Sequence, residues 1–337
     1  MKKILALTLC VLVFAGILSG CSANKKSDKI EIVTTIFPEY DWVREIVGEN
    51  NDRVNITMLI DSGADLHSYQ PTADDIVKVA TCDLFIYVGG ESDGWVADVL
   101  KTAKNPDMIV VNLLDVLGDK VKEEEVKEGM EAEDEHDHDH DEEEEHDHDH
   151  EHHHDEDEPE YDEHVWLSLK NAVDLTRYVA EKIKTLDPDH ADDYAANTAA
   201  YVAKLQALDA KYAAAVNEGT VKTLLFGDRF PFRYLVDDYG LDYFAAFVGC
   251  SAESEASFET IVFLSNKVDE LHLKAIMQIE SADGKIANTI RNQTQTKDQT
   301  VLTLDSMQSV TAKDVKNGTT YLGVMERNLE VLKEALK

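Results

Sequence analysis

Four of the thirteen histidines lie outside one acidic segment, and two of these four stand in contexts that suit metal binding. His67 lies in the stretch DLHSY (65–69), between an apolar run and a helical pattern, and His164 lies in EHVWL (163–167), ahead of another helical pattern. Strand-to-helix turns at the carboxyl edge of a parallel sheet bind ligands, and nearby acids orient an imidazole through its second nitrogen. We therefore expect both histidines to bind a metal ion.

The other two histidines of this group have less specific surroundings. His190 follows the proline of a helix start, and His272 lies among charged residues on an exposed face. A single histidine in such a place is more often a hydrogen-bonding residue than a ligand. We expect neither His190 nor His272 to bind metal.

The remaining nine histidines fall within residues 131–158, which hold 18 Asp and Glu and neither Lys nor Arg. Such a composition cannot form a core, so a disordered, solvated insertion is expected. Imidazoles with an ordinary pKa near 6.5 are mostly neutral at pH 7, so the segment could collect metal close to the main site, whereas the alternative is an acidic spacer. The histidines are His136, His138, His140, His146, His148, His150, His152, His153 and His154.

The N-terminus is typical of export. Two lysines precede an apolar run, and the run ends at Leu18-Ser19-Gly20-Cys21. This order of charge, apolar run and small residues indicates a signal peptide. The apolar run is too short for a membrane span of ~20 residues. A cysteine in that position resembles the bacterial lipobox, so we expect Cys21 to carry lipid and the protein to be extracytoplasmic, anchored to the membrane by lipid only. An ordinary signal peptide with an incidental cysteine is the alternative.

Charge and cysteine content narrow the function further. A formal net charge of −36 argues against nucleic acid, whose phosphates require Lys and Arg. After export and lipidation only Cys82 and Cys250 remain, too few for a disulfide framework. They could pair with each other, but Cys82 precedes an apolar run, and a buried free thiol is the expectation for it.

Alternating short apolar runs and amphipathic stretches predict two Rossmann-like α/β lobes with mainly parallel sheets. Helical patterns start near Glu39, Thr72 and Gly94, and a further helix is expected over 171–186. Strands are expected at 30–34, 54–59, 84–88 and 108–111 in the first lobe, and at 221–226, 243–248, 275–279 and 301–304 in the second.

A long helix is predicted between the lobes, from His190 to Asn217, because Tyr194, Tyr201, Leu205 and their neighbours form one apolar stripe. A rigid helix of this length acts as a strut rather than a hinge. The expected organisation is a signal peptide at 1–20, a lipid-anchored tether at 21–29, a first lobe at 30–186 with a disordered insertion at 121–160, a linking helix at 187–218 and a second lobe at 219–337.

The chain resembles the metal-binding receptors of ABC importers for zinc and manganese, two-lobed proteins with one long linking helix. The resemblance runs from Cys21 to the C-terminus and depends on DLHSY with PT (71–72), EHVWL with KNA (170–172), and LDSM (304–307). It implies a metal site in the interlobe cleft, with His67 and His164 from the first lobe and Asp305 from the second. It also places Glu280 near the metal.

One position departs from the family pattern. The family's third ligand, a histidine or glutamate, stands thirteen positions back from a Tyr-Gly-Leu element when both ends are counted, and here that count from Leu241 reaches Arg229. Arginine stays protonated and has no lone pair for a metal. Either Asp228 or Glu280 replaces the ligand, or water or an insertion histidine does. Alternatively, Arg229 forms an ion pair with Asp305 or Glu280.

Two imidazoles and one or two carboxylates suit Zn²⁺, whereas Mn²⁺ prefers more oxygen, and Ni²⁺ is a further candidate. The resemblance implies a monomeric receptor, not an enzyme, that delivers its ion to a permease and an ATPase in the membrane. The alternatives are a manganese or nickel receptor of the same fold and a surface metal buffer or adhesin. A zinc hydrolase with Glu280 as base is a weaker one, because no His-Glu-x-x-His or nucleophile motif occurs.

Overall fold

The computed structural model describes residues 29–48, 52–131, 160–251 and 255–337. Its first lobe contains a four-stranded parallel sheet in the order β2-β1-β3-β4. The strands are β1 (Ile30–Thr34), β2 (Val54–Met58), β3 (Leu84–Tyr87) and β4 (Ile109–Asn112), and the helices packed around them are α2 (Phe37–Val47), α3 (Ala73–Thr81), α4 (Val96–Leu100), α5 (Leu113–Leu117) and α6 (Leu169–Leu186).

The second lobe repeats this topology, with a parallel sheet in the order β6-β5-β7-β8. Its strands are β5 (Thr223–Phe230), β6 (Asp242–Val248), β7 (Ala275–Ile279) and β8 (Thr300–Leu304), and its helices are α8 (Arg233–Tyr239), α9 (Phe258–Glu270), α10 (Lys285–Gln293), α11 (Ala312–Lys316) and α12 (Tyr321–Ala335). The predicted fold class, two parallel α/β lobes joined by a long helix, is confirmed.

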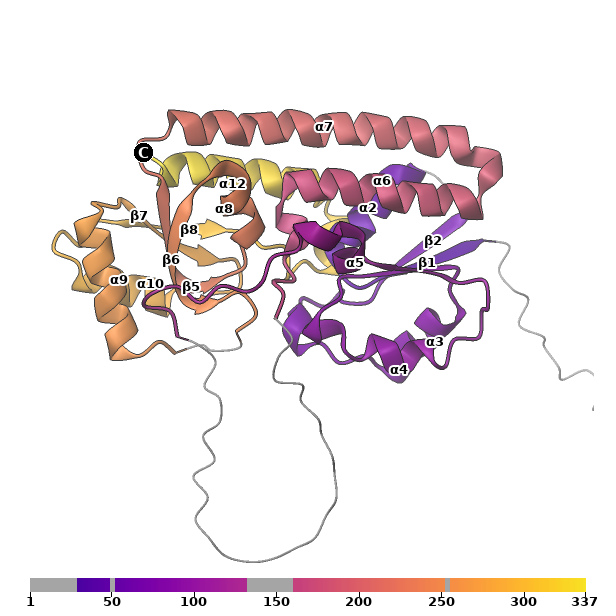
Figure 1. The fold of residues 1–337 in the computed structure, drawn as a ribbon, viewed down its shortest axis with the longest axis horizontal. Helices are drawn as coiled ribbons and strands as arrows, with labels where there is room; N and C mark the ends of the chain where they lie inside the picture. Colours follow the sequence, from indigo (N-terminus) through magenta and orange to yellow (C-terminus); the bar gives the residue numbers. More distant parts are fainter. Residues whose placement is uncertain (1–28, 49–51, 132–159, 252–254) are drawn as a thin grey trace, which may run out of the picture.

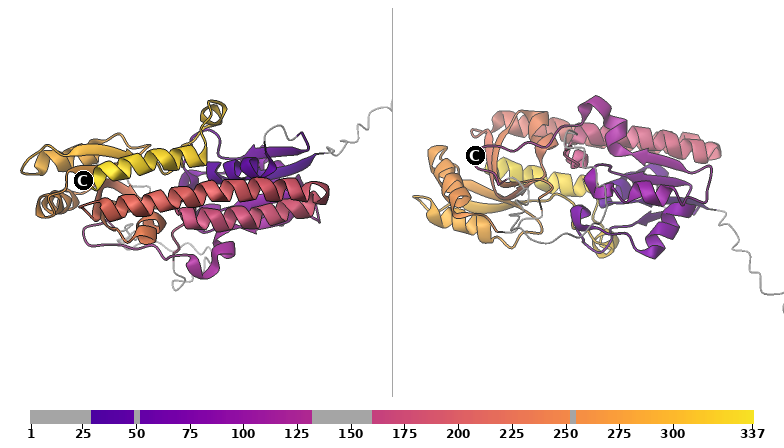
Figure 2. Two further views of the ribbon diagram at one scale, coloured as in Figure 1. Left: turned by 90° about the horizontal axis from the view of Figure 1, so that it is seen from above. Right: turned by 60° about the horizontal axis from the view of Figure 1, so that its bottom comes forward.

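The linking helix α7 (Ala191–Glu218) runs along one side of both lobes, with α6 and α12 beside it (Figures 1 and 2). Its 28 residues span about 42 Å at 1.5 Å per residue. The predicted stripe, Tyr194 to Tyr212, is buried against the lobes. Asp187 fixes the corner before it, because its carboxylate accepts the Tyr194 hydroxyl at 2.6 Å and contacts His190 Nδ1 at 2.8 Å.

The lobes also contact each other directly behind the cleft. Asp41 of α2 accepts the backbone N–H of Tyr321 at 2.8 Å, and the Tyr321 hydroxyl donates to the Trp166 carbonyl at 2.6 Å. The Trp166 indole in turn donates to the carbonyl of Ser306 at 2.9 Å. Because these groups are buried and one apolar core continues through both lobes, this side of the molecule resists hinge motion.

The expectation of disorder from residue 121 is wrong for residues 121–131, which form an ordered strap along the second lobe. Glu131 pairs with Phe247 at the edge of β6, and the Tyr243 hydroxyl donates to Glu125 at 3.1 Å. Lys127 also forms an ion pair with Asp242. The open edge of β6 supplies backbone and side-chain partners that composition alone does not reveal. The rest of the predicted insertion up to residue 159, with its nine histidines, lies outside the described residues.

The N-terminal residues 1–28, including the predicted lipid site Cys21, also lie outside the described residues. In the described part of the chain, no helix combines the length and the apolarity that crossing a membrane requires. Cys82 and Cys250 are both free thiols, and Cys82 is buried, as predicted. They therefore do not pair with each other.

Candidate metal centre

His67 reaches the cleft from a short 3₁₀ turn, Leu66–Ser68, that follows β2. Asp65 caps this turn, because its carboxylate accepts the backbone N–H of His67 at 3.0 Å. The imidazole Nδ1 lies 2.7 Å from the Ser92 hydroxyl and 3.5 Å from a carboxylate oxygen of Glu163. The turn and these contacts leave Nε2 as the atom that faces the cleft.

His164 precedes the 3₁₀ turn Val165–Leu167 and is completely buried. One carboxylate oxygen of Asp162 accepts both the backbone N–H of His164, at 2.8 Å, and its Nδ1–H, at 3.0 Å. A carboxylate on Nδ1 fixes the tautomer in which Nε2 carries the lone pair. The acids around the EHVWL stretch therefore orient the imidazole, as the sequence predicts.

The two imidazoles meet with their Nε2 atoms 3.1 Å apart. Acceptors beside both Nδ1 atoms favour a lone pair on each Nε2, so two lone pairs face one point. Two nitrogens that bind one tetrahedral Zn²⁺ at about 2.05 Å lie about 3.3 Å apart. The separation in this chain therefore suits a shared cation.

The protonation of His67 also suits a cation. Burial, followed by the neighbouring His164 and Arg229, lowers the pKa of His67 to about 3 against the opposing effect of Asp65. The imidazole is therefore neutral at neutral pH, which is the form that binds metals.

Cys250 completes a cluster that the sequence analysis did not predict. The thiol and one ring nitrogen each of His67 and His164 lie within 4.8 Å of one another, and no other group of three ligand-type side chains meets this criterion in the described part of the chain. Burial raises the pKa of the Cys250 thiol, and the carboxylates of Glu124, Asp162 and Glu163 raise it further. A bound cation would reverse this effect, because a coordinating thiol loses its proton.

The acids predicted from the second lobe lie at the ends of its strands, but outside this three-residue cluster. Both oxygens of Glu280 accept hydrogen bonds from the loop after β8, including the Ser306 N–H at 2.7 Å and the Gln308 N–H at 3.1 Å. Asp228 accepts the N–H groups of Arg229 at 2.9 Å and Ile279 at 3.0 Å. These two carboxylates therefore brace their own lobe.

The carboxylate of Asp305 accepts fewer hydrogen bonds than those of Glu280 and Asp228. Its Oδ1 accepts the N–H of Met307 at 2.8 Å. Burial and, after it, the charge of Glu280 raise the pKa of Asp305 to about 6. A buried carboxyl group with a raised pKa is stabilised by an added cation.

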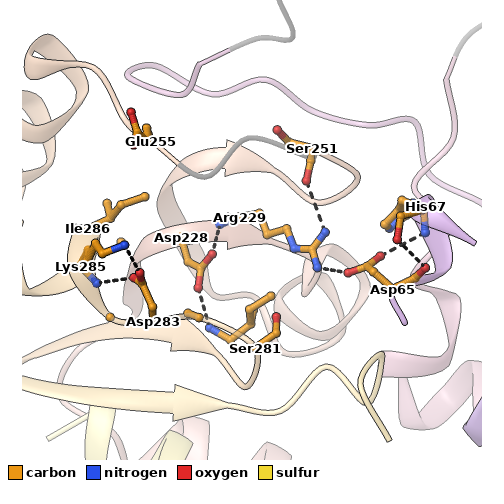
Figure 3. A pocket seen from close by; sticks show the side chains of 15 residues that line it. Asp65, His67, Asp228, Arg229, Ser251, Glu255, Ser281, Asp283, Lys285 and Ile286 are labelled. Atoms are coloured by element: carbon orange, nitrogen blue, oxygen red, sulfur yellow. Dashed lines mark hydrogen bonds and ion pairs between the residues drawn. The ribbon is translucent and has the colours of Figure 1, made fainter. Parts of the chain in front are cut away.

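Arg229 bridges the lobes instead of pairing within its own. The expected ion pair with Asp305 or Glu280 is wrong, because the guanidinium pairs with Asp65 across the cleft and also donates to the Ser251 carbonyl at 3.3 Å (Figure 3). Burial of Asp65 raises its pKa, but Arg229 and His67 outweigh this and hold the pKa below its usual value.

A cavity of about 500 Å³ opens beside this ion pair, between the two lobes. From the first lobe it is lined by Asp65, His67 and Ser68, and from the second by Asp228, Arg229, Ser251, Glu255 and residues 281–286 (Figure 3). Solvent therefore reaches His67 from this side, whereas His164 is covered.

Two parallel α/β lobes, a long connecting helix and paired histidines at the cleft define the class of two-lobed binding proteins. The chain belongs to the family described as zinc-uptake complex component A, periplasmic, whose model matches residues 32–335. The predicted resemblance is thereby confirmed. The family is one of substrate-binding transport proteins rather than enzymes.

Individual relatives agree with this assignment. The chain is 34% identical to the zinc-binding lipoprotein AdcA of Streptococcus pneumoniae serotype 4 over 99% of its own length, but spans only 61% of that relative. It is 30% identical to the high-affinity zinc uptake system protein ZnuA of Bacillus subtilis, covering 94% of this chain and 90% of the relative.

Solved structures give the same result. The Zn(II)-bound ZnuA-like domain of Streptococcus pneumoniae AdcA matches with a TM-score of 0.67 and 27% identity, over 91% of this chain and 99% of that one. The metal-dependent lipoprotein YcdH from Bacillus subtilis matches with a TM-score of 0.70 and 25% identity, again over 91% and 99%.

Proposed function

We propose that this chain captures a divalent transition metal, zinc, between its lobes and delivers it to the permease and ATPase of an ABC importer. The observation that carries the proposal is the pair of Nε2 atoms 3.1 Å apart, each imidazole oriented by a hydrogen bond at Nδ1. His67 and His164 are the first-lobe ligands. No chemistry on the ion follows, so the protein acts as a receptor and not as an enzyme.

Asp305 is the second-lobe carboxylate that this proposal favours as a ligand. Its Oδ1 accepts one backbone N–H, whereas both oxygens of Asp228 and of Glu280 accept hydrogen bonds. Recruiting Asp228 or Glu280 would break bonds that hold their own loops, and each lost bond to a charged group costs about 1.5–3 kcal/mol. Asp305 could turn Oδ2 to the ion at a lower cost.

Zinc is favoured over manganese because neutral imidazoles are borderline-soft donors, whereas manganese prefers oxygen. The names of the relatives point the same way, since AdcA is called zinc-binding and ZnuA a zinc uptake protein. The nine histidines of residues 136–154 would raise the local concentration of the same ion. Nickel or manganese remains an outcome of the test below.

The site of action that fits this function is extracytoplasmic. Removal of the signal peptide before Cys21 would leave this cysteine to carry lipid. The lipid and the polar tether after it would then hold a monomeric receptor at the membrane surface. The family description, periplasmic, and the word lipoprotein in the name of AdcA support this arrangement.

Competitive titration of the protein with zinc, manganese and nickel against a chelator, followed by elemental analysis, tests the proposal. We expect one tight zinc site that His67→Ala and His164→Ala each weaken on the order of 100-fold, beside weaker sites from the acidic segment. His272→Asn is the matched control, because His272 lies at φ 53°, where asparagine is tolerated. An unchanged tight site in both alanine variants would refute the cleft assignment, and equal affinity for manganese would refute the choice of zinc.

A further inference from the structure

Cys250 reaches the histidine pair because of the residue before it. Cys250 follows β6 by two residues, and Gly249 packs directly against the ring of His164. A Cβ atom at Gly249 would lie 3.1 Å from His164 Cε1 and 3.0 Å from the Phe230 carbonyl oxygen, tighter than ordinary van der Waals contact. A glycine at this position therefore allows the loop to bring the thiol to the imidazoles.

The turn that carries Cys250 is also fixed from two other sides. Glu124, in the strap at residues 121–131, accepts the backbone N–H of Cys250 at 3.2 Å. Arg229 donates to the carbonyl of the next residue, Ser251, at 3.3 Å. These contacts hold the thiol beside the two imidazoles.

We propose that Cys250 is a metal ligand, so that the ion is held by two imidazole nitrogens and one thiolate, with Asp305 or water in the fourth position. This inference rests on the proposed function, because it takes His67 and His164 as ligands. A tetrahedral zinc with two nitrogens and one sulfur has its ligand atoms about 3.3–3.6 Å apart. The three ligand atoms lie within 4.8 Å of one another, so small side-chain shifts suffice. On binding, a metal–sulfur bond forms and the thiol proton passes to solvent.

In this proposal Cys250 supplies the second-lobe ligand that Arg229 cannot supply. Arg229 stands where the family resemblance implies a ligand, and its guanidinium cannot bind a cation. The same side chain holds the Ser251 carbonyl and reaches Asp65 across the cleft. Arg229 is thus a positioning residue, and the second lobe offers sulfur where an imidazole or carboxylate would otherwise stand.

A thiolate also changes which metals the site accepts. Sulfur is a soft ligand that suits Zn²⁺ and is poorly matched to Mn²⁺, which prefers oxygen. The expected result is a preference for zinc over manganese that depends on Cys250 itself.

Cobalt(II) titration tests the proposal, because a cobalt–thiolate bond gives a near-ultraviolet charge-transfer band that nitrogen and oxygen ligands do not. The full chain is used, with the nine histidines of 136–154 replaced by asparagine in every variant so that the cleft dominates. We expect the band in this parent protein and in Cys82→Ser, the matched control at the other free thiol. We expect Cys250→Ser to lose the band and to bind zinc on the order of 100-fold more weakly.

A second substitution separates ligation from packing. Cys250→Asp offers an oxygen ligand, so it should regain part of the zinc affinity without the band and reduce the preference for zinc over manganese. Thermal unfolding of the metal-free variants checks that each one folds.

Two outcomes would overturn the inference: a band that persists in Cys250→Ser, or no band in the parent. If zinc affinity in that case still depends on His67 and His164, the proposed function stands and only the thiolate is wrong. If His67→Ala and His164→Ala also leave the tight site unchanged, the proposed function itself fails.

Discussion

The two lobes share one sheet order, yet they use their strand-end loops differently. In the first lobe, acids support imidazoles: Asp162 orients His164, and Glu163 lies near His67 Nδ1. In the second lobe, the carboxylates of Glu280 and Asp228 accept backbone amides of their own loops. A repeated fold therefore does not imply a repeated donor set, because the same edge of the sheet can orient ligands or brace a loop.

The edge strands sharpen this comparison. His67 follows β2 and Cys250 follows β6. Each of these strands is the second of its lobe along the chain, and each lies at the edge of its sheet. Corresponding loops of the two lobes thus bring an imidazole and a thiol to the same point. Ligands bind at the carboxyl ends of strands in such sheets, and here both lobes contribute at equivalent places.

The largest expected effect compares the histidine pair of the first lobe with the carboxylate of Asp305 in the second. Four-ligand zinc sites bind with about 10–16 kcal/mol, so one ligand is worth about 3 kcal/mol. We expect His67→Ala to weaken zinc binding on the order of 100-fold and Asp305→Asn to weaken it only about 10-fold, since the histidine pair stays intact. Chelator competition measures both. An equal loss in the two variants would show that Asp305 contributes as much to zinc binding as His67.

A smaller effect is expected from removing the Asp162 carboxylate, which accepts the Nδ1–H of His164. Asp162→Asn removes the carboxylate that fixes the imidazole tautomer, and losses of this kind typically reduce metal affinity by about 10–100-fold. Asp192→Asn, an exposed position on α7, is the matched control. Calorimetric titration with zinc checks the prediction, and an affinity unchanged in Asp162→Asn would mean that packing alone orients His164.

Much of the fold could be predicted from the sequence, because buried parallel strands leave continuous apolar runs. The bounds expected for β1 and β7 match the structure, and the stripe on α7 is buried as the spacing of Tyr194 to Tyr212 indicates. The strap at 121–131 could not be predicted, because its order depends on the distant edge of β6 and not on its own composition.

The site was predictable to a lesser degree. The contexts of His67 and His164 carry local signals, and the structure brings these residues together, while their binding of metal stays a prediction. Cys250 has no such signal, because a lone cysteine after a strand is common, and its proximity to the histidines arises only from the docking of the lobes. The glycine before it, Gly249, is the one sequence feature that would have pointed to a close approach.

Glu280 offers a way to separate bracing from ligation in the second lobe. Glu280→Gln puts an amide NH₂ where backbone N–H groups of Ser306 and Gln308 now donate, so we expect the metal-free protein to lose about 1–3 kcal/mol of unfolding free energy. Zinc affinity should fall less than about 10-fold. Urea unfolding and chelator competition give the two numbers. A large loss of affinity at unchanged stability would instead make Glu280 a ligand.

The smallest effect concerns the ion pair that joins the lobes across the cleft. Arg229 and Asp65 are partly shielded from solvent, so a double-mutant cycle of Arg229→Met and Asp65→Asn should give a coupling free energy of about 1 kcal/mol in zinc binding. Salt should reduce it, because ions screen partly exposed charges. Since Asp65→Asn leaves the bond from Arg229 to Ser251 in place, it should speed zinc release a few-fold without loss of the thiolate signal. Zero coupling would mean that the lobes are held closed by the contacts around α7 and Tyr321, and that Arg229 acts only through the turn that carries Cys250.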